Sequence, residues 1–207
     1  MNVSLREDSA PARSRAETRR RLVASGTELF ASRGLHAVTT HSIASAAGVA
    51  AGTFYLHFKD KQALFREIAL AAADDLRERL ERSTREAATV EAAVRDRAAE
   101  FLAFTAEHRD LVRILFGRGQ EVPELASEIL DAFASFLKGR LDGQIADGVL
   151  ERALDSAVAA QALVGMIARV MAWWAEEPGR APQSDVIETL SRLQLTGLSP
   201  GTEAPLD

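Results

Sequence analysis

Hydrophobic residues recur at helical spacing along almost the whole chain. In the segment Ala16–Ser32, Leu22, Leu29 and Phe30 fall on one helix face, and Gly34 follows as a residue suited to end the helix. No segment shows the sustained alternation of apolar and polar residues that is typical of a β-strand. The pattern therefore predicts an all-α protein.

The same spacing predicts further helices, separated by turn residues. Gly48 marks a turn between two short helices, Asp60 can cap the start of a long helix, and Pro178 with Gly179 marks a stop. After the first helix, the expected segments are Thr40–Ala47, a short helix ending near Phe58, Lys61–Ser83, Val90–Glu107, Asp110–Gly117, Pro123–Asp147, Ala153–Glu177 and Ser184–Gln194.

These helices divide the chain into a small first part and a larger second part. We expect a disordered arm over residues 1–13, a three-helix domain over residues 14–60, and a larger helical domain over residues 61–196. Residues 61–83 form the connecting helix of the larger domain. Residues 197–207, which contain Gly, Pro and Ser, are expected to form a flexible tail.

The net charge of −5 is distributed unevenly along the chain. Residues 1–66 carry ten Lys and Arg against five Asp and Glu, whereas the remaining residues carry fifteen against twenty-five. This asymmetry indicates an anion-binding module attached to an acidic body.

The residue types narrow the possible chemistry. The chain has no cysteine, which excludes disulfide bonds and thiolate metal sites, and its four histidines lie in no metal-ligand spacing. We find no nucleophile elbow, no dinucleotide fingerprint and no convincingly paired carboxylates. We therefore expect no metal, no cofactor and no catalytic residues, although a helical enzyme without a recognisable motif stays open as an alternative.

The most apolar segment is Ser156–Ala175, which Arg169 interrupts. Its charge-free part is too short to cross a bilayer, so we expect a buried interface helix rather than a membrane span. The first residues also lack the apolar stretch of a secretory signal. We therefore expect a cytoplasmic protein with no membrane partner.

Residues 39–58 combine the features of two short helices that cross at a sharp turn. Ala44 is small where the helices would nearly touch, Gly48 tolerates the positive φ of a turn, and Thr39 or Thr40 can cap the first helix. This spacing predicts a helix-turn-helix, whose second helix lies in the major groove of DNA. On this block alone, an ordinary helical hairpin stays open. The apolar residues expected between the helices are Ile43, Ala47, Val49, Phe54 and Phe58.

The continuation Gly52–Phe65, which reads GTFYLHFKDKQALF, resembles the signature of the tetracycline-repressor (TetR) family of bacterial transcription regulators. Upstream, Arg20–Phe30 together with Gly34 resembles the first helix of that family. The resemblance implies a repressor that binds a palindromic double-stranded DNA operator as a homodimer and is released by a small molecule. An activator of the same family and a non-specific architectural DNA protein stay open as alternatives.

The resemblance also implies roles for single residues. Ala50, Ala51 and Thr53 match base-reading positions, and His41 matches a position that in some relatives carries a base-contacting arginine. The two alanines offer only methyl contacts, so part of the specificity is expected from His41, Thr53 or DNA shape. The residues that match phosphate-binding positions are Thr40, Tyr55, His57, Lys59 and Lys61. For His57 a structural cap is the alternative, and for the lysines a solvated surface charge.

The arginines of the first helix are open between two interpretations. Arg13, Arg15 and the run Arg19–Arg21 either form an arm that touches DNA or serve as a soluble helix start.

By the same resemblance, the last two helices pair with their copies in a partner to form the dimer interface. A monomeric core is the alternative for this apolar set. The expected interface residues are Leu163, Ile167, Val170, Trp174, Ile187, Leu190 and Leu193.

An effector pocket is expected among the helices from Val90 to Trp174, for an unidentified apolar or amphipathic molecule. Gln161 and Arg169 interrupt the most apolar helix, and buried polar groups need partners. Each apolar candidate could equally be plain core, and Arg169 could form an intersubunit salt bridge. The expected lining residues are Phe104, His108, Arg113, Phe116, Phe133, Gln161, Met166, Arg169 and Trp173.

Overall fold

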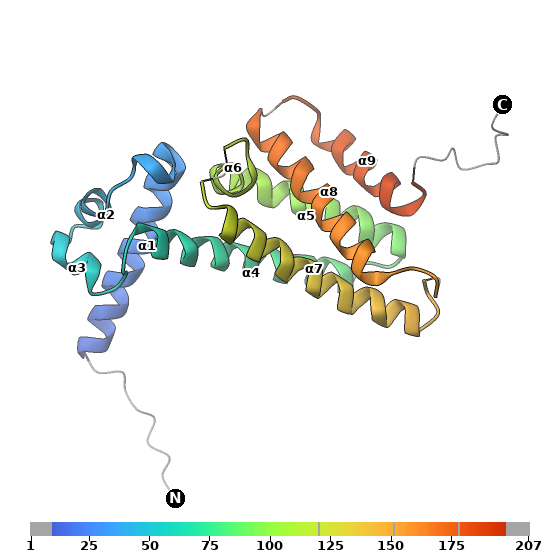
Figure 1. Ribbon diagram of the computed structural model, residues 1–207, viewed down its shortest axis with the longest axis horizontal. Helices are drawn as coiled ribbons and strands as arrows, with labels where there is room; N and C mark the ends of the chain where they lie inside the picture. Colours follow the sequence, from blue (N-terminus) through green and yellow to red (C-terminus); the bar gives the residue numbers. More distant parts are fainter. Residues whose placement is uncertain (1–9, 120, 151, 178, 198–207) are drawn as a thin grey trace, which may run out of the picture. The chain divides into compact units, whose positions relative to one another are not determined.

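The computed structural model describes residues 10–119, 121–150, 152–177 and 179–197, and in these ranges it is helical with no strand (Figure 1). The predicted all-α class is therefore confirmed. The helices are α1 Ala10–Ala37, α2 Thr40–Ala46, α3 Ala51–Tyr55, α4 Lys61–Glu86, α5 Val90–Glu107, α6 Arg109–Phe116, α7 Pro123–Ala146, α8 Ser156–Glu176 and α9 Gln183–Leu195.

The predicted helices agree with the observed ones to within a few residues at most ends. The largest difference is α1, which begins at Ala10, so residues 10–13 of the expected disordered arm are helical. Gly34 does break this helix, with φ 74° and ψ 166°, before a last turn continues to Ala37. The remainder of the expected arm and residues 198–207 of the expected tail lie outside the described residues.

The chain forms two compact units, Met1–Ala69 and Leu70–Asp207, with α4 contributing to both. This division falls inside α4, whereas the predicted boundary lies before it, after residue 60. The first part of α4 belongs to the first unit because Leu64 and Phe65 are fully buried there. Phe65 also meets Phe30 of α1 edge to face, with ring centroids 5.4 Å apart. Such packing fixes the start of α4 against α1.

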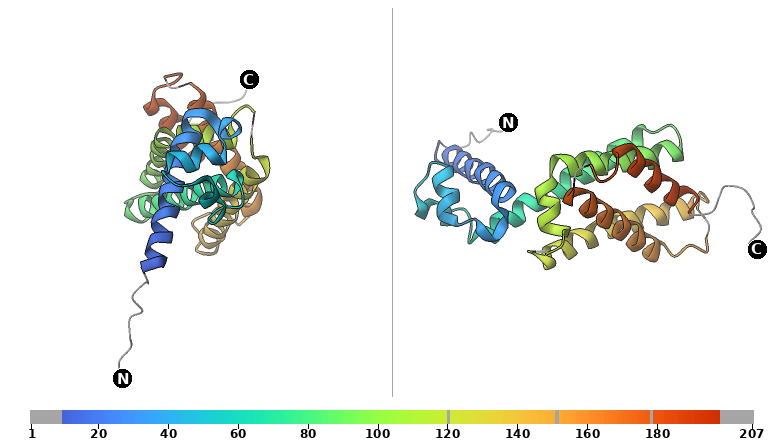
Figure 2. Two further views of the ribbon diagram at one scale, coloured as in Figure 1. Left: turned by 90° about the vertical axis from the view of Figure 1, so that its left-hand side faces the viewer. Right: turned by 90° about the horizontal axis from the view of Figure 1, so that it is seen from above.

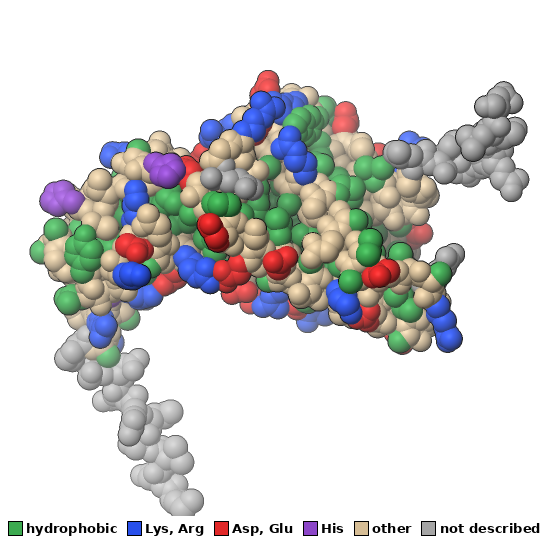
Figure 3. Space-filling model, in the orientation of Figure 1, with side chains coloured by type: hydrophobic (Ala, Val, Ile, Leu, Met, Phe, Trp, Pro, Cys, Tyr) green, Lys and Arg blue, Asp and Glu red, His purple; other side chains and the backbone are tan. Residues whose placement is uncertain are grey.

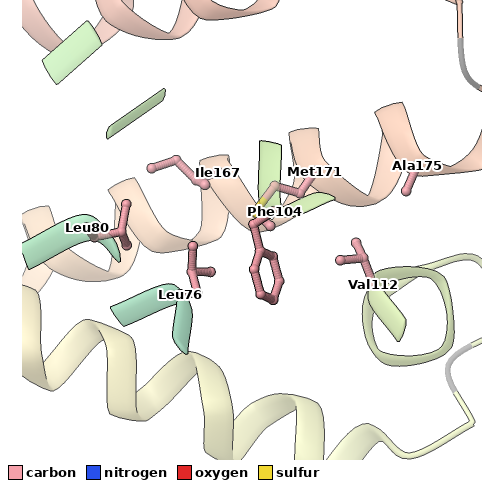
Figure 4. Packing of buried hydrophobic residues seen from close by; sticks show 7 residues of the cluster. All are labelled: Leu76, Leu80, Phe104, Val112, Ile167, Met171 and Ala175. Atoms are coloured by element: carbon pink, nitrogen blue, oxygen red, sulfur yellow. The ribbon is translucent and has the colours of Figure 1, made fainter. Parts of the chain in front are cut away.

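The second unit is held together by two apolar clusters. In Figure 4, Phe104 of α5 and Met171 of α8 point toward the side chains of the larger cluster. A second cluster joins α5 to α9, which lie side by side in Figure 2. The larger cluster contains Leu76, Leu80, Phe104, Val112, Ile167, Met171 and Ala175, and the smaller one contains Ala98, Leu102, Val186 and Leu190.

Helix α8 is only partly buried within the single chain. A helix that is apolar nearly all round is expected to be buried on all sides. Only 22% of the most apolar stretch of α8, which is long and apolar enough to cross a membrane, consists of residues buried within the chain. Val158, near its start, is 65% exposed. The single chain therefore leaves one side of α8 uncovered.

Candidate nucleic-acid interface

The start of α2 is fixed by a reciprocal cap. Thr39 Oγ1 accepts a hydrogen bond from the Ser42 backbone N–H at 3.1 Å, and Ser42 Oγ accepts one from the Thr39 N–H at 3.1 Å. This capping box satisfies two N–H groups that a helix start leaves without partners. Of the two candidate caps, Thr39 therefore performs this task, which leaves the hydroxyl of Thr40 available for another contact.

The turn between α2 and α3 depends on a glycine and an arginine. Gly48 adopts φ 64°, the left-handed region that favours glycine. The Arg21 guanidinium of α1 donates to the carbonyl oxygens of Ala47 and Gly48, the latter at 3.0 Å. A positive charge at the end of a helix also interacts favourably with the helix dipole. Arg21 thus fastens the end of α2 to α1.

A second arginine holds the end of α3. Arg19 donates to the His57 carbonyl at 3.1 Å, pairs with Glu67 of α4, and lies 4.4 Å from the centroid of the Phe58 ring. Arg15 adds a longer bond, 3.4 Å, to the Leu56 carbonyl. Of the first-helix arginines, which the sequence left open between a DNA arm and a soluble start, Arg15, Arg19 and Arg21 therefore brace the helix-turn-helix. Arg20 instead pairs with Glu17 within α1.

At the surface of the helix-turn-helix, two hydroxyl groups lie close together. Thr40 Oγ1, at the first residue of α2, lies 3.0 Å from the hydroxyl of Tyr55, the last residue of α3. The Tyr55 side chain is 60% exposed, while its ring meets the fully buried Phe54 edge to face at 5.5 Å. Tyr55 is therefore anchored by its ring and presents its hydroxyl to solvent.

The other predicted DNA-binding residues lie around this pair in different degrees of exposure. His41, Ala50, Ala51 and Lys59 are exposed. Thr53 and His57 are half-buried. The α2–α3 segment thus presents the expected side chains on its surface without any of them belonging to the buried core.

The surroundings of His57 disfavour the protonated form of its imidazole. Burial lowers the pKa of the His57 imidazole below its ordinary value, and the charges of Arg15 and Arg19 lower it further because they repel a proton. A neutral imidazole contributes a hydrogen bond, and no full positive charge, at this edge of the unit.

Lys61 has a structural task in the free protein that the sequence did not reveal. Its ammonium donates to the carbonyl oxygens of Leu35, His36 and Val38 at 2.8, 3.0 and 2.8 Å. An ammonium has three donors, and all three are used here. Lys61 thus closes the carboxyl end of α1, and its phosphate contact stays a prediction.

Comparison with known proteins decides the family. The sequence pattern described as "Bacterial regulatory proteins, tetR family" matches residues 22–68, and the "Tetracyclin repressor-like, C-terminal domain" matches residues 87–198, more than half of the chain. The chain belongs to the TetR family. It is a DNA-binding transcriptional regulator, as the helix-turn-helix indicated.

Relatives within the TetR family match most of the chain. The transcriptional repressor KstR2 of Rhodococcus jostii is 30% identical over 187 residues, which cover 86% of this chain and 87% of KstR2. The fatty acid metabolism regulator protein of Bacillus subtilis is 27% identical over 157 residues, covering 74% of this chain and 81% of that protein.

Solved structures have the same fold. FadR of Bacillus halodurans has a TM-score of 0.75 at 21% identity and covers 93% of this chain and 98% of its own. FadR of Bacillus subtilis, solved in complex with stearoyl-CoA, has a TM-score of 0.73 at 24% identity and covers 87% of this chain and 99% of its own.

The second unit of this TetR-family regulator brings together the apolar half of the expected pocket. Phe116, Phe133 and Met166 are half-buried and pack against the larger cluster, to which the buried Phe104 belongs. His108 lies on Phe104 with ring centroids 4.4 Å apart, and burial lowers the pKa of its imidazole. These side chains come from four helices and converge on one apolar centre.

Apart from His108, the polar candidates for the pocket lie elsewhere. Gln161 and Arg169 are exposed on α8 in the single chain, so neither is buried among the side chains of the larger cluster, and an intersubunit salt bridge of Arg169 stays a prediction. Arg113 is also exposed and pairs with Asp110 on the surface of α6 at 3.1 Å. Trp173 is half-buried beneath the Arg180 guanidinium, 5.1 Å from the ring centroid.

The expected dimer residues divide into two groups. Ile167 and Leu190 are 8% and 2% exposed and belong to the chain's own clusters, so a partner subunit would bury almost no further surface of these side chains. The remaining members are half-buried on α8 and α9, and hydrophobic side chains are open to solvent over α8 (Figure 3). These half-buried members are Leu163, Val170, Trp174, Ile187 and Leu193.

Proposed function

We propose that this TetR-family regulator is a repressor that acts by binding alone, without catalysis, as a cytoplasmic homodimer on a palindromic operator. An amphipathic small molecule in the second unit releases it from DNA. The observation that carries the DNA-binding part is the Thr40–Tyr55 hydroxyl pair, exposed on a helix-turn-helix that Arg19 and Arg21 hold rigid.

In this proposal, different side chains bind the DNA phosphates and recognise the base edges. Tyr55, Thr40 and Lys59 bind phosphates, since hydroxyl and ammonium donors pair with phosphate oxygens and carry no sequence information. Thr53 and His41 read base edges, and the methyl groups of the exposed Ala50 and Ala51 contact thymine methyls.

A second copy of the chain covers the exposed side of α8. Val158, Ala162 and Gly165 are exposed at helical spacing on this side, and their small size allows another helix to approach closely. A bilayer is the poorer partner, because Gln161 and the charged Arg169 lie exposed on the same helix. A two-fold dimer also suits an inverted repeat, which offers two equal half-sites.

An amphipathic effector is supported by the aromatic side chains of the second unit and by the relatives. Phe101, Phe116 and Phe133 are large and yet half-buried beside the larger cluster, so an apolar ligand would remove further surface from water. Among the similar proteins, one is named for fatty acid metabolism and one was solved with stearoyl-CoA.

Sedimentation and operator binding of Ala162→Glu test the dimer that this function needs. Two carboxylates facing each other across the interface should give a monomer that has lost most of its operator affinity. The matched control is Ala132→Glu, which replaces an exposed alanine on α7 and should stay dimeric and bind DNA as the wild type does. A dimeric Ala162→Glu variant with full operator affinity would contradict the proposed assembly.

A further inference from the structure

One line of side chains on α5 joins the apolar centre of the second unit to an arginine. Spacings of four, three and four residues place four side chains on one face of α5, namely Arg97, Phe101, Phe104 and His108. Phe104 is a member of the larger cluster, and Phe101 packs against it. Arg97 therefore stands one turn before the aromatic side chains that line this cluster.

Helix α7 carries the same arrangement in the opposite order. Phe133 packs against the larger cluster, and Arg140 follows seven residues later on the same face. The Arg140 guanidinium lies 6.0 Å from the centroid of the Phe136 ring. Helices α5 and α7 run in opposite directions (Figure 1), and the Arg140 charge acts on Arg97, so both arginines lie toward one end of the cluster.

These two arginines differ from the other half-buried arginines of the second unit. Among its described residues, Arg77, Arg79, Arg109 and Arg180 are also half-buried, and each donates to a carboxylate or a backbone carbonyl. The structure gives neither Arg97 nor Arg140 such a partner in the same residue ranges.

The environment of Arg97 is electrostatically unfavourable in the free protein. Burial lowers the pKa of the Arg97 guanidinium, and the nearby Arg140 charge lowers it further. A partly desolvated cation without a counter-charge costs folding free energy, and a like charge beside it adds to the cost. A bound anion would relieve both effects at once.

We propose that Arg97 and Arg140 form an oxyanion-binding pair that holds the acidic head group of the effector, while its apolar part lies along Phe101 and Phe133. This inference rests on the proposed effector-binding function and specifies its chemical class. Guanidinium groups suit carboxylate and phosphate oxygens because their N–H groups form a planar fork. The head group is therefore a carboxylate, as in a fatty acid, or a phosphate, as in a coenzyme A thioester.

Titration calorimetry of the full-length protein with three probes tests this pair. The probes are decanoate, decanoyl-coenzyme A and uncharged 1-decanol, all below their micellar concentrations. The wild type should bind at least one acidic probe about tenfold or more tightly than decanol, as expected for a charge-assisted hydrogen bond. A preference for decanoate would show that the site binds a carboxylate. A preference for decanoyl-coenzyme A alone would show that the site binds a phosphate.

Variants assign this preference to the two arginines. Arg97→Gln and Arg140→Gln should bind the three probes within a few-fold of one another. Arg97→Lys, which keeps the charge and loses the fork, should be intermediate. The matched control is Arg95→Gln on the same helix, where an exposed ion pair with Glu188 is lost and the acidic preference should remain.

Stability separates this role from a structural one. Arg97→Met should raise the urea midpoint of the ligand-free protein, because it removes an unpaired half-buried charge, whereas a structural arginine would lower it when replaced. Three results would contradict the proposed oxyanion-binding pair. The wild type could bind all three probes equally, it could bind none of them, or Arg97→Gln could keep the full preference for an acidic probe. If an acidic probe binds through Arg97 and yet leaves operator affinity unchanged, only the proposed release from DNA fails.

Discussion

The hydroxyls of Thr40 and Tyr55 lie 3.0 Å apart, joining the first residue of α2 to the last residue of α3 across the exposed edge of the helix-turn-helix. Each hydroxyl thereby holds the other in place before any ligand arrives. Donors that are already oriented lose less conformational freedom on binding than free ones. The pair therefore presents a preformed surface for a phosphate group.

Removing one hydroxyl of this pair should weaken DNA binding without weakening the fold. We expect Tyr55→Phe to lower operator affinity about a hundredfold, because a dimer loses two hydrogen bonds to charged acceptors, while the free energy of unfolding changes by less than about 0.5 kcal/mol. Fluorescence anisotropy and urea denaturation measure the two effects. Thr27→Val removes an exposed hydroxyl bonded only to Val23 within α1, and this control should bind as the wild type does.

Lys61→Met should destabilise the first unit. The variant leaves three carbonyls at the end of α1 without the Lys61 ammonium, which should reduce the free energy of unfolding by about 2 kcal/mol. Urea denaturation measures this loss. The neighbouring Lys59→Met replaces an exposed lysine and should change stability by less than about 0.5 kcal/mol. If the two variants were equally stable, the structural role assigned to Lys61 would be contradicted.

Lys59 should instead govern the salt dependence of DNA binding. Each lost phosphate contact reduces the slope of log K against log salt by about 0.9, and a dimer loses two, so Lys59→Ala should reduce the slope by about 1.8. The loss should be equal on operator and on unrelated DNA. A change restricted to the operator would instead make Lys59 a base-reading residue.

The sequence predicted the positions of the helices well because its turn and cap residues act locally. Asp60 Oδ1 accepts from the Ala63 N–H at 2.7 Å at the start of α4, and Gly48 has the positive φ that its place in the turn required. In both cases the interaction spans only a few residues, so the order of residues along the chain is enough to predict it. The same holds for the exposed edge, since Thr40 and Tyr55 follow from the family motif.

The tertiary roles of charged residues could not be predicted in this way. Arg19, Arg21 and Lys61 bond to carbonyls 38, 26 to 27, and 23 to 26 residues away, and neither helical spacing nor composition shows these contacts. Gln161 and Arg169 were expected inside an apolar helix, yet one side of α8 is uncovered and both are exposed there. No local pattern marked Arg97 either, because its lack of a partner depends on which side chains the folded second unit brings near α5.

Acidification should destabilise the free protein through its two half-buried histidines. Burial lowers the pKa of His57 and His108, with Arg15 and Arg19 adding to the effect at His57. As pH falls below about 6.5, the ordinary histidine value, the unfolded state takes up protons before the folded state does, so folding stability is lost. Stability should therefore be constant above this pH and decline from pH 6.5 toward the lowered pKa values.

Thermal melting of His57→Gln and His108→Gln between pH 7.5 and 5.5 checks the assignment. Each variant should lose part of the decline that the wild type shows. His41→Gln, which replaces an exposed histidine on the surface of α2, is the control and should keep the decline. A wild-type protein that becomes more stable over this range would contradict the direction of both shifts.

Selection of bound duplexes from a random DNA pool by the purified dimer tests the central claim most directly. Two copies of the α2–α3 edge should recover one inverted repeat, with half-site centres separated by about one helical turn or a multiple of it. Thr53→Ala should recover a repeat that is altered at particular bases, whereas Tyr55→Phe should recover the same repeat more weakly. Recovery of no consensus, or of single half-sites without symmetry, would contradict a dimer that reads DNA through this edge.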